Sequence, residues 1–376
     1  MPLHEGQLLA QRWRVGHVLG VGGMAVVVFA QDVQDGSEVA IKALLPASMR
    51  VPAIVARFVR ERGILRMMTS PYVPRLLDEG ALEDGTPYAV MEYLQGSTLA
   101  DLFVKWGTLP VQTAADFLIQ ACAAAAEAHS FGVVHRDFKP ENLFVTTGPN
   151  GFPVVKVLDF GISKPLLEVA AEGSTEEQGL TRANDVLGSP SYMPPEQLVA
   201  SRRVDYGADI WSLGVILQEM VAGVRPFDGD TVQSVRIAVM TSSPKLPSAF
   251  RTDLPASLDD VVRRCVQKFP ESRYPSAEAL ARDLLPFASS PDRSAAVLEL
   301  IASYGSPAPV SVRSVPAEKL PLLYGPFPMP LVAEPIVPKA RSRKLLRRRA
   351  LRVLLPVAIA GLLAGCGLGL LLSPFL

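Results

Sequence analysis

Apolar residues follow two different spacings along the chain, and the change falls near Gly96. Before it lie short β-rich runs separated by turn residues, at 13–19, 25–30, 38–44 and 88–93. One helical pattern, at 54–68, interrupts these runs and ends before Pro71. After Gly96 the longest patterns are helical, at 114–129 and 209–221. The sequence therefore predicts an α+β fold with a strand-rich front lobe, about 10–95, and a larger helical back lobe, about 96–287.

The last ninety residues or so have a different character. Nine prolines among residues 307–338 predict a semi-rigid, extended linker over 288–338. Eight of the 14 residues from 339 to 352 are Lys or Arg, and 20 consecutive apolar residues follow at 353–372. A helix of that length spans about 30 Å, the thickness of the hydrocarbon core of a bilayer. We therefore expect a transmembrane helix at 353–372 behind a basic juxtamembrane segment, with a buried core helix as the alternative.

The basic segment also predicts the orientation of this helix, because Lys and Arg concentrate on the cytoplasmic side of a membrane. The expected localisation is the inner (cytoplasmic) membrane, single-pass, with the preceding domain in the cytoplasm. Gly361, Gly365 and Gly369 would share one smooth helix face, which is a candidate seam for a homodimer. Glycine is common in membrane helices, so its spacing also fits a helix that does not dimerise.

The charge distribution bears on the class of partner. The whole chain is neutral, with 37 basic and 37 acidic residues. Because eight of the basic residues lie in 339–352, residues 1–338 carry a formal charge of −8. Phosphate-backbone binding normally rests on a basic face, so the sequence predicts no nucleic-acid partner for the main body of the chain.

Two features of the front lobe suit phosphate chemistry. A hairpin turn with the sequence Gly20-Val21-Gly22-Gly23 would let backbone N–H groups approach phosphate oxygens, although an ordinary turn has the same composition. Lys42 lies in a mostly apolar strand, where an unpaired ammonium group is costly. Glu61 on the following helix is a candidate partner. The alternative is a lysine that reaches solvent from an edge strand.

The back lobe holds a denser cluster of chemical groups. The sequence from His135 to Asn142 is HRDFKPEN, and Asp159 follows 17 residues later in Asp-Phe-Gly. Asn142 and Asp159 offer the hard oxygen ligands that Mg²⁺ prefers in proteins. Asp137 could then accept the proton of a hydroxyl group. A single aspartate of this kind could equally cap a helix or lie in a solvated loop, but the ordered set favours phosphate transfer.

These motifs, in their order and spacing, make residues 13–287 resemble a eukaryotic-type protein kinase domain. The glycine turn, which reads GxGGMxxV, is similar to that of the bacterial Hanks-type serine/threonine kinases. The resemblance implies a bilobal kinase fold over 10–287 that transfers the γ-phosphate of ATP to protein Ser/Thr hydroxyls. It also implies Mg²⁺ as the metal, with Mn²⁺ as a substitute, and protein substrates as partners.

The resemblance assigns roles to individual residues. Lys42 would hold the α- and β-phosphates and pair with Glu61, Asp137 would be the catalytic base, and Lys139 would neutralise charge on the transferred group. Asn142 and Asp159 would be the magnesium ligands. The residues that would contact ATP lie on the glycine-rich hairpin, the next strand and the hinge: Leu19, Gly20, Val21, Gly22, Gly23, Met24, Ala25, Val26, Val27, Ala40, Lys42, Met91, Glu92 and Leu94.

Later segments also resemble the family. Gly188 to Glu196 resembles the segment that contacts the acceptor peptide, and Asp209 to Gly214 resembles the start of a conserved helix. Arg273 is expected to form a buried ion pair with Glu196. In the loop from Gly161 to Glu196, Thr181 is the expected autophosphorylation site. Ser174 and Thr175 in the same loop fit solvated hydroxyls.

Three residues depart from the family pattern without removing a catalytic group: Ala25, Ser189 and Pro194. Two other functions were compared with protein phosphorylation. A pseudokinase scaffold would require the loss of a catalytic residue, and all four of Lys42, Asp137, Asn142 and Asp159 are present. A small-molecule kinase of related fold is disfavoured by the peptide-binding segment. A membrane-localised assembly platform could coexist with catalysis.

Overall fold

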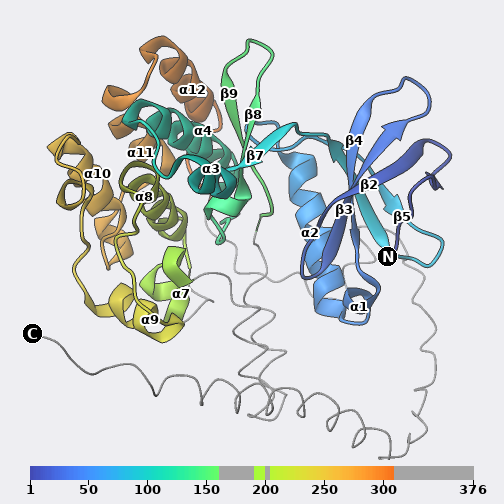
Figure 1. Cartoon of the computed structure of the whole chain (residues 1–376), viewed down its shortest axis with the longest axis horizontal. Coiled ribbons are helices and arrows are strands. Elements are labelled where there is room, and N and C mark those ends of the chain that lie inside the picture. Colours follow the sequence, from blue (N-terminus) through green and yellow to red (C-terminus); the bar gives the residue numbers. More distant parts are fainter. Residues whose placement is uncertain (161–189, 200–203, 309–376) are drawn as a thin grey trace, which may run out of the picture. The chain divides into compact units, whose positions relative to one another are not determined.

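The structure is a computed structural model that describes residues 1–160, 190–199 and 204–308 (Figure 1). Within these residues, no helix is both long and apolar enough to cross a bilayer. The predicted transmembrane helix at 353–372 and the basic segment at 339–352 lie outside the described residues, as do 309–338 of the predicted linker and Thr181.

The front lobe is built on a six-stranded antiparallel sheet with the order β1-β2-β3-β4-β6-β5. Its strands are β1 (Leu8–Leu9), β2 (Trp13–Val21), β3 (Ala25–Asp32), β4 (Glu38–Leu44), β5 (Leu76–Ala81) and β6 (Pro87–Glu92). Helices α1 (Pro46–Met49) and α2 (Pro52–Met67) connect β4 to β5. Trp13, Val28 and Ile41 belong to the core on one side of the sheet. Phe58 of α2 packs against Leu44 in a second cluster, which fixes α2 on the sheet.

The back lobe is mainly helical (Figure 1). It contains α3 (Leu99–Trp106), α4 (Val111–Ser130), α7 (Pro195–Val199), α8 (Gly207–Ala222), α9 (Val232–Thr241), α10 (Ala256–Cys265), α11 (Ala277–Leu284) and α12 (Pro291–Ser303). Short 3₁₀ turns lie at Pro140–Asn142, Pro190–Tyr192, Pro247–Ala249, Pro270–Ser272 and Leu285–Phe287.

Helices α4 and α8 form the centre of this lobe. Both are buried along most of their length, because apolar or small residues occupy nearly every face. Gly214 of α8 allows α10 to approach closely, since a Cβ at this position would lie 2.2 Å from the Cβ of Cys265. The helical patterns at 114–129 and 209–221 are confirmed and extended by one to three residues at each end.

A small three-stranded sheet lies where the chain enters the back lobe. Its strands β7 (Gly96–Thr98), β8 (Leu143–Thr147) and β9 (Pro153–Val157) are antiparallel in the order β7-β8-β9. The segment from His135 to Asn142 leads into β8, and Asp159 comes two residues after β9. This hairpin therefore brings the two motifs of the back lobe to the same edge.

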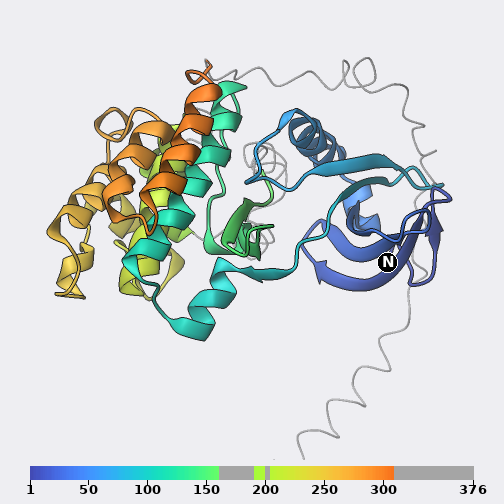
Figure 2. The same cartoon turned by 90° about the horizontal axis from the view of Figure 1, so that it is seen from above.

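The structure corrects the start of the predicted linker. Residues 291–303, which we expected to belong to an extended segment, form helix α12 and pack along α4 (Figure 2). Pro291 and Asp292 stand in the first turn, where a proline loses no hydrogen bond and an acidic residue is favoured by the helix dipole. Ile301 is 2% exposed and joins the main core. The prolines that break helices begin only at Pro307.

Candidate active site

Lys42 forms the link between the two lobes at the candidate site. Its Nζ lies 2.7 Å from Oε1 of Glu61 on α2 and 2.6 Å from Oδ1 of Asp159. The side chains of Lys42 and Glu61 are 9% and 6% exposed, whereas that of Asp159 is 56% exposed. The buried lysine thus has the anionic partner that its apolar strand requires. Asp159 keeps an open side from which its carboxylate can meet a ligand.

Lys42 and Asp159 hold each other in the ionised form, while burial raises the pKa of Glu61. Burial alone would lower the pKa of Lys42, but the carboxylates of Asp159 and Glu61 outweigh it and raise the pKa above its usual value. The ammonium group of Lys42 in turn lowers the pKa of Asp159. Lys42 therefore stays cationic at neutral pH and can attract phosphate oxygens.

Asp137 lies in a network of short contacts within its own loop. Nδ2 of Asn142 donates to the main-chain oxygen of Asp137 at 2.8 Å and to its Oδ2 at 3.2 Å. Nζ of Lys139 is also 3.2 Å from Oδ2 of Asp137. The Asp137 side chain is 14% exposed and that of Lys139 is 24% exposed. A carboxylate, a cation and a carboxamide thus converge on one partly open position.

His135 holds this loop through hydrogen bonds of both its ring nitrogens. Its Nε2 lies 3.1 Å from the carbonyl oxygen of Leu158, so Nε2 carries the proton and donates. Nδ1 is then free to accept from the N–H of Asp137 at 3.2 Å. Burial lowers the pKa of His135, which favours this neutral tautomer. The ring also stacks on Phe138, with centroids 4.2 Å apart. His135 therefore connects the loop of Asp137 to the residue before Asp159.

Asp209, at the start of α8, holds the backbone of the same loop. Its Oδ2 accepts the N–H of His135 at 2.9 Å, and its Oδ1 accepts the N–H of Arg136 at 2.8 Å. His129 Nε2 lies 2.8 Å from Oδ2. Burial alone would raise the pKa of Asp209, but the hydrogen bond from His129 and the neighbouring groups keep it lowered. Arg136 has φ of +63°, a left-handed backbone that costs an ordinary residue about 1–2 kcal/mol. Asp209 offsets this strain by two hydrogen bonds.

Asn142 and Asp159 are brought together through the backbone. The N–H of Leu158, next to Asp159, donates to the carbonyl oxygen of Asn142 at 2.8 Å. Within the described residues, no cluster of three or more His, Cys, Asp or Glu side chains is arranged to hold a metal ion. Asn142 and Asp159 instead supply two hard oxygen donors, a set that fits Mg²⁺ with phosphate and water as further ligands.

The predicted ATP-contacting residues lie on the front-lobe sheet and at its exit. In the strand register Val27 lies opposite Lys42, and Ala40 lies opposite Met91. Because side chains alternate along a strand, these four residues share one face of the sheet. The glycine-rich hairpin connects β2 to β3, with the N–H of Gly22 donating to the oxygen of Ala25 at 2.9 Å. The other residues of this hairpin that were predicted to contact ATP are Leu19, Gly20, Val21, Gly23, Met24 and Val26.

The predicted hinge follows β6. The carboxylate of Glu92 accepts hydrogen bonds from Lys156 of β9 and from the N–H of Arg75. Its own N–H donates to the oxygen of Arg75 at 3.0 Å. Among the described residues, no hydrogen bond uses the N–H of Leu94. This main-chain group can therefore donate to a ligand.

The predicted ion pair between Glu196 and Arg273 is confirmed. Two nitrogens of the guanidinium group lie 2.7 and 2.9 Å from the two carboxylate oxygens. Ser189 lies outside the described residues. The described part of the peptide-binding segment, from Pro190 onward, is attached to α8 by a bond from the hydroxyl of Ser212 to the oxygen of Tyr192 at 2.8 Å.

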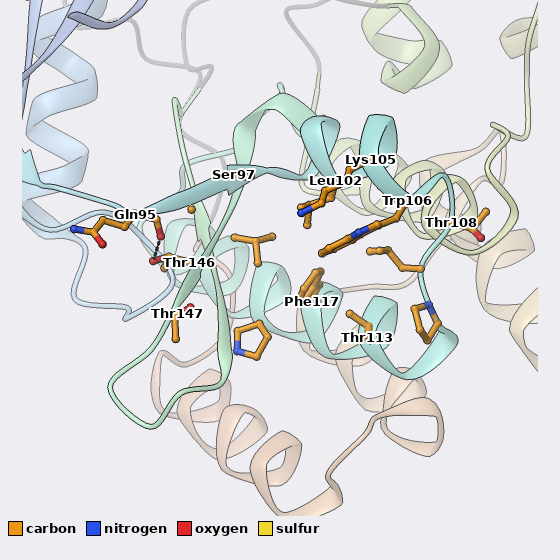
Figure 3. A pocket seen from close by; sticks show the side chains of 15 residues that line it. Gln95, Ser97, Leu102, Lys105, Trp106, Thr108, Thr113, Phe117, Thr146 and Thr147 are labelled. Atoms are coloured by element: carbon orange, nitrogen blue, oxygen red, sulfur yellow. Dashed lines mark hydrogen bonds between the residues drawn. The ribbon is translucent and has the colours of Figure 1, made fainter. Parts of the chain in front are cut away.

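A cavity of about 530 Å³ lies elsewhere in the back lobe, between α3, the start of α4 and the small sheet (Figure 3). Trp106 and Phe117 line it, and the hydroxyl of Thr146 beside it donates to the oxygen of Gln95 at 2.7 Å. None of the lining residues is a predicted site residue.

Sequence reasoning missed part of the support for the site. It assigned no role to His129 and did not foresee that Asp209 holds the backbone of His135 and Arg136. Two signals were available in the sequence: both residues are polar, and both occur within strongly apolar helices. Such positions normally need a buried partner.

Comparison with known proteins identifies the class. Residues 13–285 match the family described as the protein kinase domain, so the chain belongs to the protein kinase family. This match confirms the predicted Hanks-type kinase domain and the bilobal kinase fold.

The relatives are bacterial. A probable serine/threonine-protein kinase of Clostridium perfringens is 35% identical over 279 residues, which cover 74% of this chain and 38% of that protein. Serine/threonine-protein kinase PknB of Mycobacterium tuberculosis is 35% identical over 280 residues, covering 74% and 43% of the two chains. The crystal structure of a double mutant of the Mycobacterium tuberculosis PknI kinase domain superposes with a TM-score of 0.57 at 26% identity. It covers 77% of this chain and 100% of that chain. The chain therefore spans about two fifths of the length of these curated relatives.

Proposed function

We propose that this chain is a serine/threonine protein kinase that transfers the γ-phosphate of ATP to hydroxyl groups of proteins. The observation that carries the proposal is the convergence of two groups on one place. The first is the Lys42–Glu61–Asp159 triad, and the second is the loop that holds Asp137, Lys139 and Asn142. The position of Lys139, two residues after Asp137, resembles the serine/threonine type, and the two named relatives are called a probable serine/threonine-protein kinase and a serine/threonine-protein kinase.

The proposal gives a task to each residue. Lys42 would attract the α- and β-phosphates, and Asn142 and Asp159 would hold a divalent cation, Mg²⁺ or Mn²⁺, which neutralises phosphate charge when bound. The substrate oxygen bonds to the γ-phosphorus while the bond to the bridging oxygen breaks. Asp137 accepts the proton of the substrate hydroxyl, and Lys139 stabilises the negative charge of the transferred group.

The glycine-rich hairpin supports nucleotide binding. A Cβ built on Gly20 or Gly23 would meet no described atom within 4 Å, and neither residue has a positive φ. Protein packing and backbone conformation therefore do not require glycine at these two positions. A phosphate that approaches the backbone closely would require it.

Activation by autophosphorylation at Thr181 is a further part of the proposal. The guanidinium group of Arg136, next to Asp137, donates to the oxygen of Val204 at 3.2 Å. Its Nε is buried and has no partner among the described residues. A phosphate on the loop would supply a charge-assisted acceptor for this group.

The proposed location is the inner membrane, with the kinase domain in the cytoplasm. It rests on the 20 apolar residues at 353–372 and the eight basic residues that precede them. Membrane-tethered signalling, and a homodimer through Gly361, Gly365 and Gly369, would follow from such an anchor. Fractionation of bacterial cells tests it. The full chain should sediment with membranes, and a chain ending at Ala308 should not; equal distribution of the two would contradict the tether.

The activity is tested with the purified full chain and its Asp137→Asn variant, given ATP, Mg²⁺ and a generic serine/threonine substrate protein. Transfer by the wild-type chain that the substitution abolishes would support the proposal. ATP binding without transfer, in the presence of detergent micelles and substrate, would argue against it. Mass spectrometry of the same samples tests the phosphosite: the absence of phosphate on Thr181 after incubation with ATP would exclude it.

A further inference from the structure

The chain continues in ordered form beyond the part that matches the kinase family. The match ends at residue 285, and residues 291–308, which we call the C-terminal strap, follow it. Helix α12 runs alongside α4 (Figure 2), and its Ile301 is buried in the main core. Just before the strap, the N–H of Ser289 donates to Asp116 of α4 at 3.1 Å. The strap is thus fixed along the length of α4.

The end of the strap makes two polar contacts close to the catalytic loop. The N–H of Ala308 donates to the carbonyl oxygen of His129, the penultimate residue of α4, at 3.0 Å. The hydroxyl of Tyr206, just before α8, donates to the oxygen of Ala308. The ring of Tyr206 also packs on the ring of His129, with centroids 4.4 Å apart. Ala308 and Tyr206 therefore hold His129 through its backbone and its ring.

His129 transmits this contact to the loop of Asp137. Its Nε2 lies 2.8 Å from Oδ2 of Asp209, the carboxylate that accepts the N–H groups of His135 and Arg136. Both histidine and aspartate side chains are fully buried. Only two residues therefore separate the end of the strap from the strained backbone at Arg136.

We propose that Tyr206 and the C-terminal strap are positioning elements for phosphate transfer, acting on the catalytic loop through His129 and Asp209. The inference rests on the proposed kinase function. When the Ala308 contacts are intact, the imidazole of His129 has one orientation, and Asp209 is aligned with the two N–H groups. When they are lost, Asp209 gains freedom, and the left-handed backbone at Arg136 loses the bonds that offset its strain. Asp137, the next residue, then loses its position.

The location of the strap connects the catalytic loop to the segment that follows Ala308. Residues 309–376 follow Ala308 directly in the chain, so tension on them along the chain would act on Ala308. A strap that only stabilised the fold would raise the melting temperature without affecting the loop. A positioning strap must in addition change the turnover number and the exposure of two specific amides.

Two substitutions remove one bond each from the full-length chain. Tyr206→Phe removes the hydroxyl but keeps the ring on His129. Ala308→Pro removes the N–H between two residues that are already proline, where extended backbone is favoured. Tyr274→Phe is the matched control, because its buried hydroxyl donates to Asp283 at 2.8 Å in the same lobe, away from the loop.

The readouts are the kinetic constants for phosphate transfer and the hydrogen exchange of the N–H groups of His135 and Arg136. One lost hydrogen bond corresponds to about a fivefold effect. We expect each strap variant to lower kcat about fivefold with the KM for ATP unchanged, and to speed exchange of both amides by a similar factor. Tyr274→Phe should leave these values as in the wild-type chain.

Two other results are informative. If the strap variants match the wild-type chain or the Tyr274→Phe control in kcat and exchange, the inference is wrong, even where their melting temperatures fall. If the wild-type chain transfers no phosphate, the proposed function fails. Amide exchange then decides the inference alone: faster exchange confined to the two strap variants supports it, and unchanged exchange overturns it.

Discussion

The ion pair between Glu196 and Arg273 allows a quantitative test of the structure, through the substitution Arg273→Lys. The arginine is 3% exposed and uses all five of its N–H groups. Nε donates to Gln267 O, and the two terminal nitrogens donate to both oxygens of Glu196 and to the carbonyl oxygens of Gly207 and Lys268. Lysine keeps the charge but has three donors on one atom, so at least two of the five acceptors lose their partner.

The expected loss follows from that count. A buried acceptor without a partner costs about 1–3 kcal/mol, so two of them predict a loss of about 3 kcal/mol. For a domain of this size, that corresponds to a fall of about 6–12 °C in Tm. Tryptophan fluorescence can follow the transition, because the guanidinium carbon lies 5.0 Å from the ring of Trp211.

The control is Arg282→Lys, which alters a pair with Glu278 on the surface of α11, where the two side chains are 65% and 40% exposed. Exposed pairs of this kind contribute about 0.5 kcal/mol or less, so Tm should change by less than about 2 °C. An equal change for the two variants, or a change below about 2 °C for Arg273→Lys, would refute the assignment of five buried hydrogen bonds to Arg273.

Three further substitutions or conditions have expected outcomes. Gly214→Ala should destabilise the chain by about 1–3 kcal/mol in denaturant titration, and Cys265→Ala should not rescue it, because the clash is with the Cβ atom. The pKa of His135 is lowered from 6.5 in the folded chain, so the unfolded chain binds its proton first as pH falls. The free energy of unfolding should therefore decrease below about pH 6.5, and a smaller decrease is expected for His135→Gln. Lys42→Met leaves Glu61 buried without its cation and should lower the rate of phosphate transfer about 100-fold or more.

The front lobe shows which parts of a fold are readable from sequence. The strands at 13–21, 25–32, 38–44 and 87–92 were predicted within one or two residues, because apolar and β-branched runs end at glycine or polar turns. Strand β5 was not predicted. Its sequence, LLDEGA, contains two acidic residues and a glycine, and it lies at the edge of the sheet, where none of its residues is fully buried. Edge strands follow the neighbouring strand more than their own composition.

The candidate site also has a part that the sequence predicted and a part that it did not. Lys42, Asp137 and Asp159 were found because each belongs to a short motif with fixed spacing. The contacts of Asp209 with the loop join residues more than 70 positions apart, and no local pattern describes such a pair. A carboxylate in an apolar segment indicates that it needs hydrogen-bond donors, but only the fold determines which donors it contacts.

Helix α12 shows why the end of a domain is harder to predict than its centre. The nine prolines after residue 306 dominated the composition of the predicted linker, although the thirteen residues of α12 contain only one proline, at the first helical position. Val297, Leu298 and Ile301 have helical spacing. Ile301 is buried in the main core, and Val297 and Leu298 are half-buried against it. Helix-forming residues without a partner surface give a marginal helix, so the helix depends on α4 for its stability. A domain boundary at residue 287 would remove the segment that contacts His129. A soluble kinase fragment should therefore extend to Ala308.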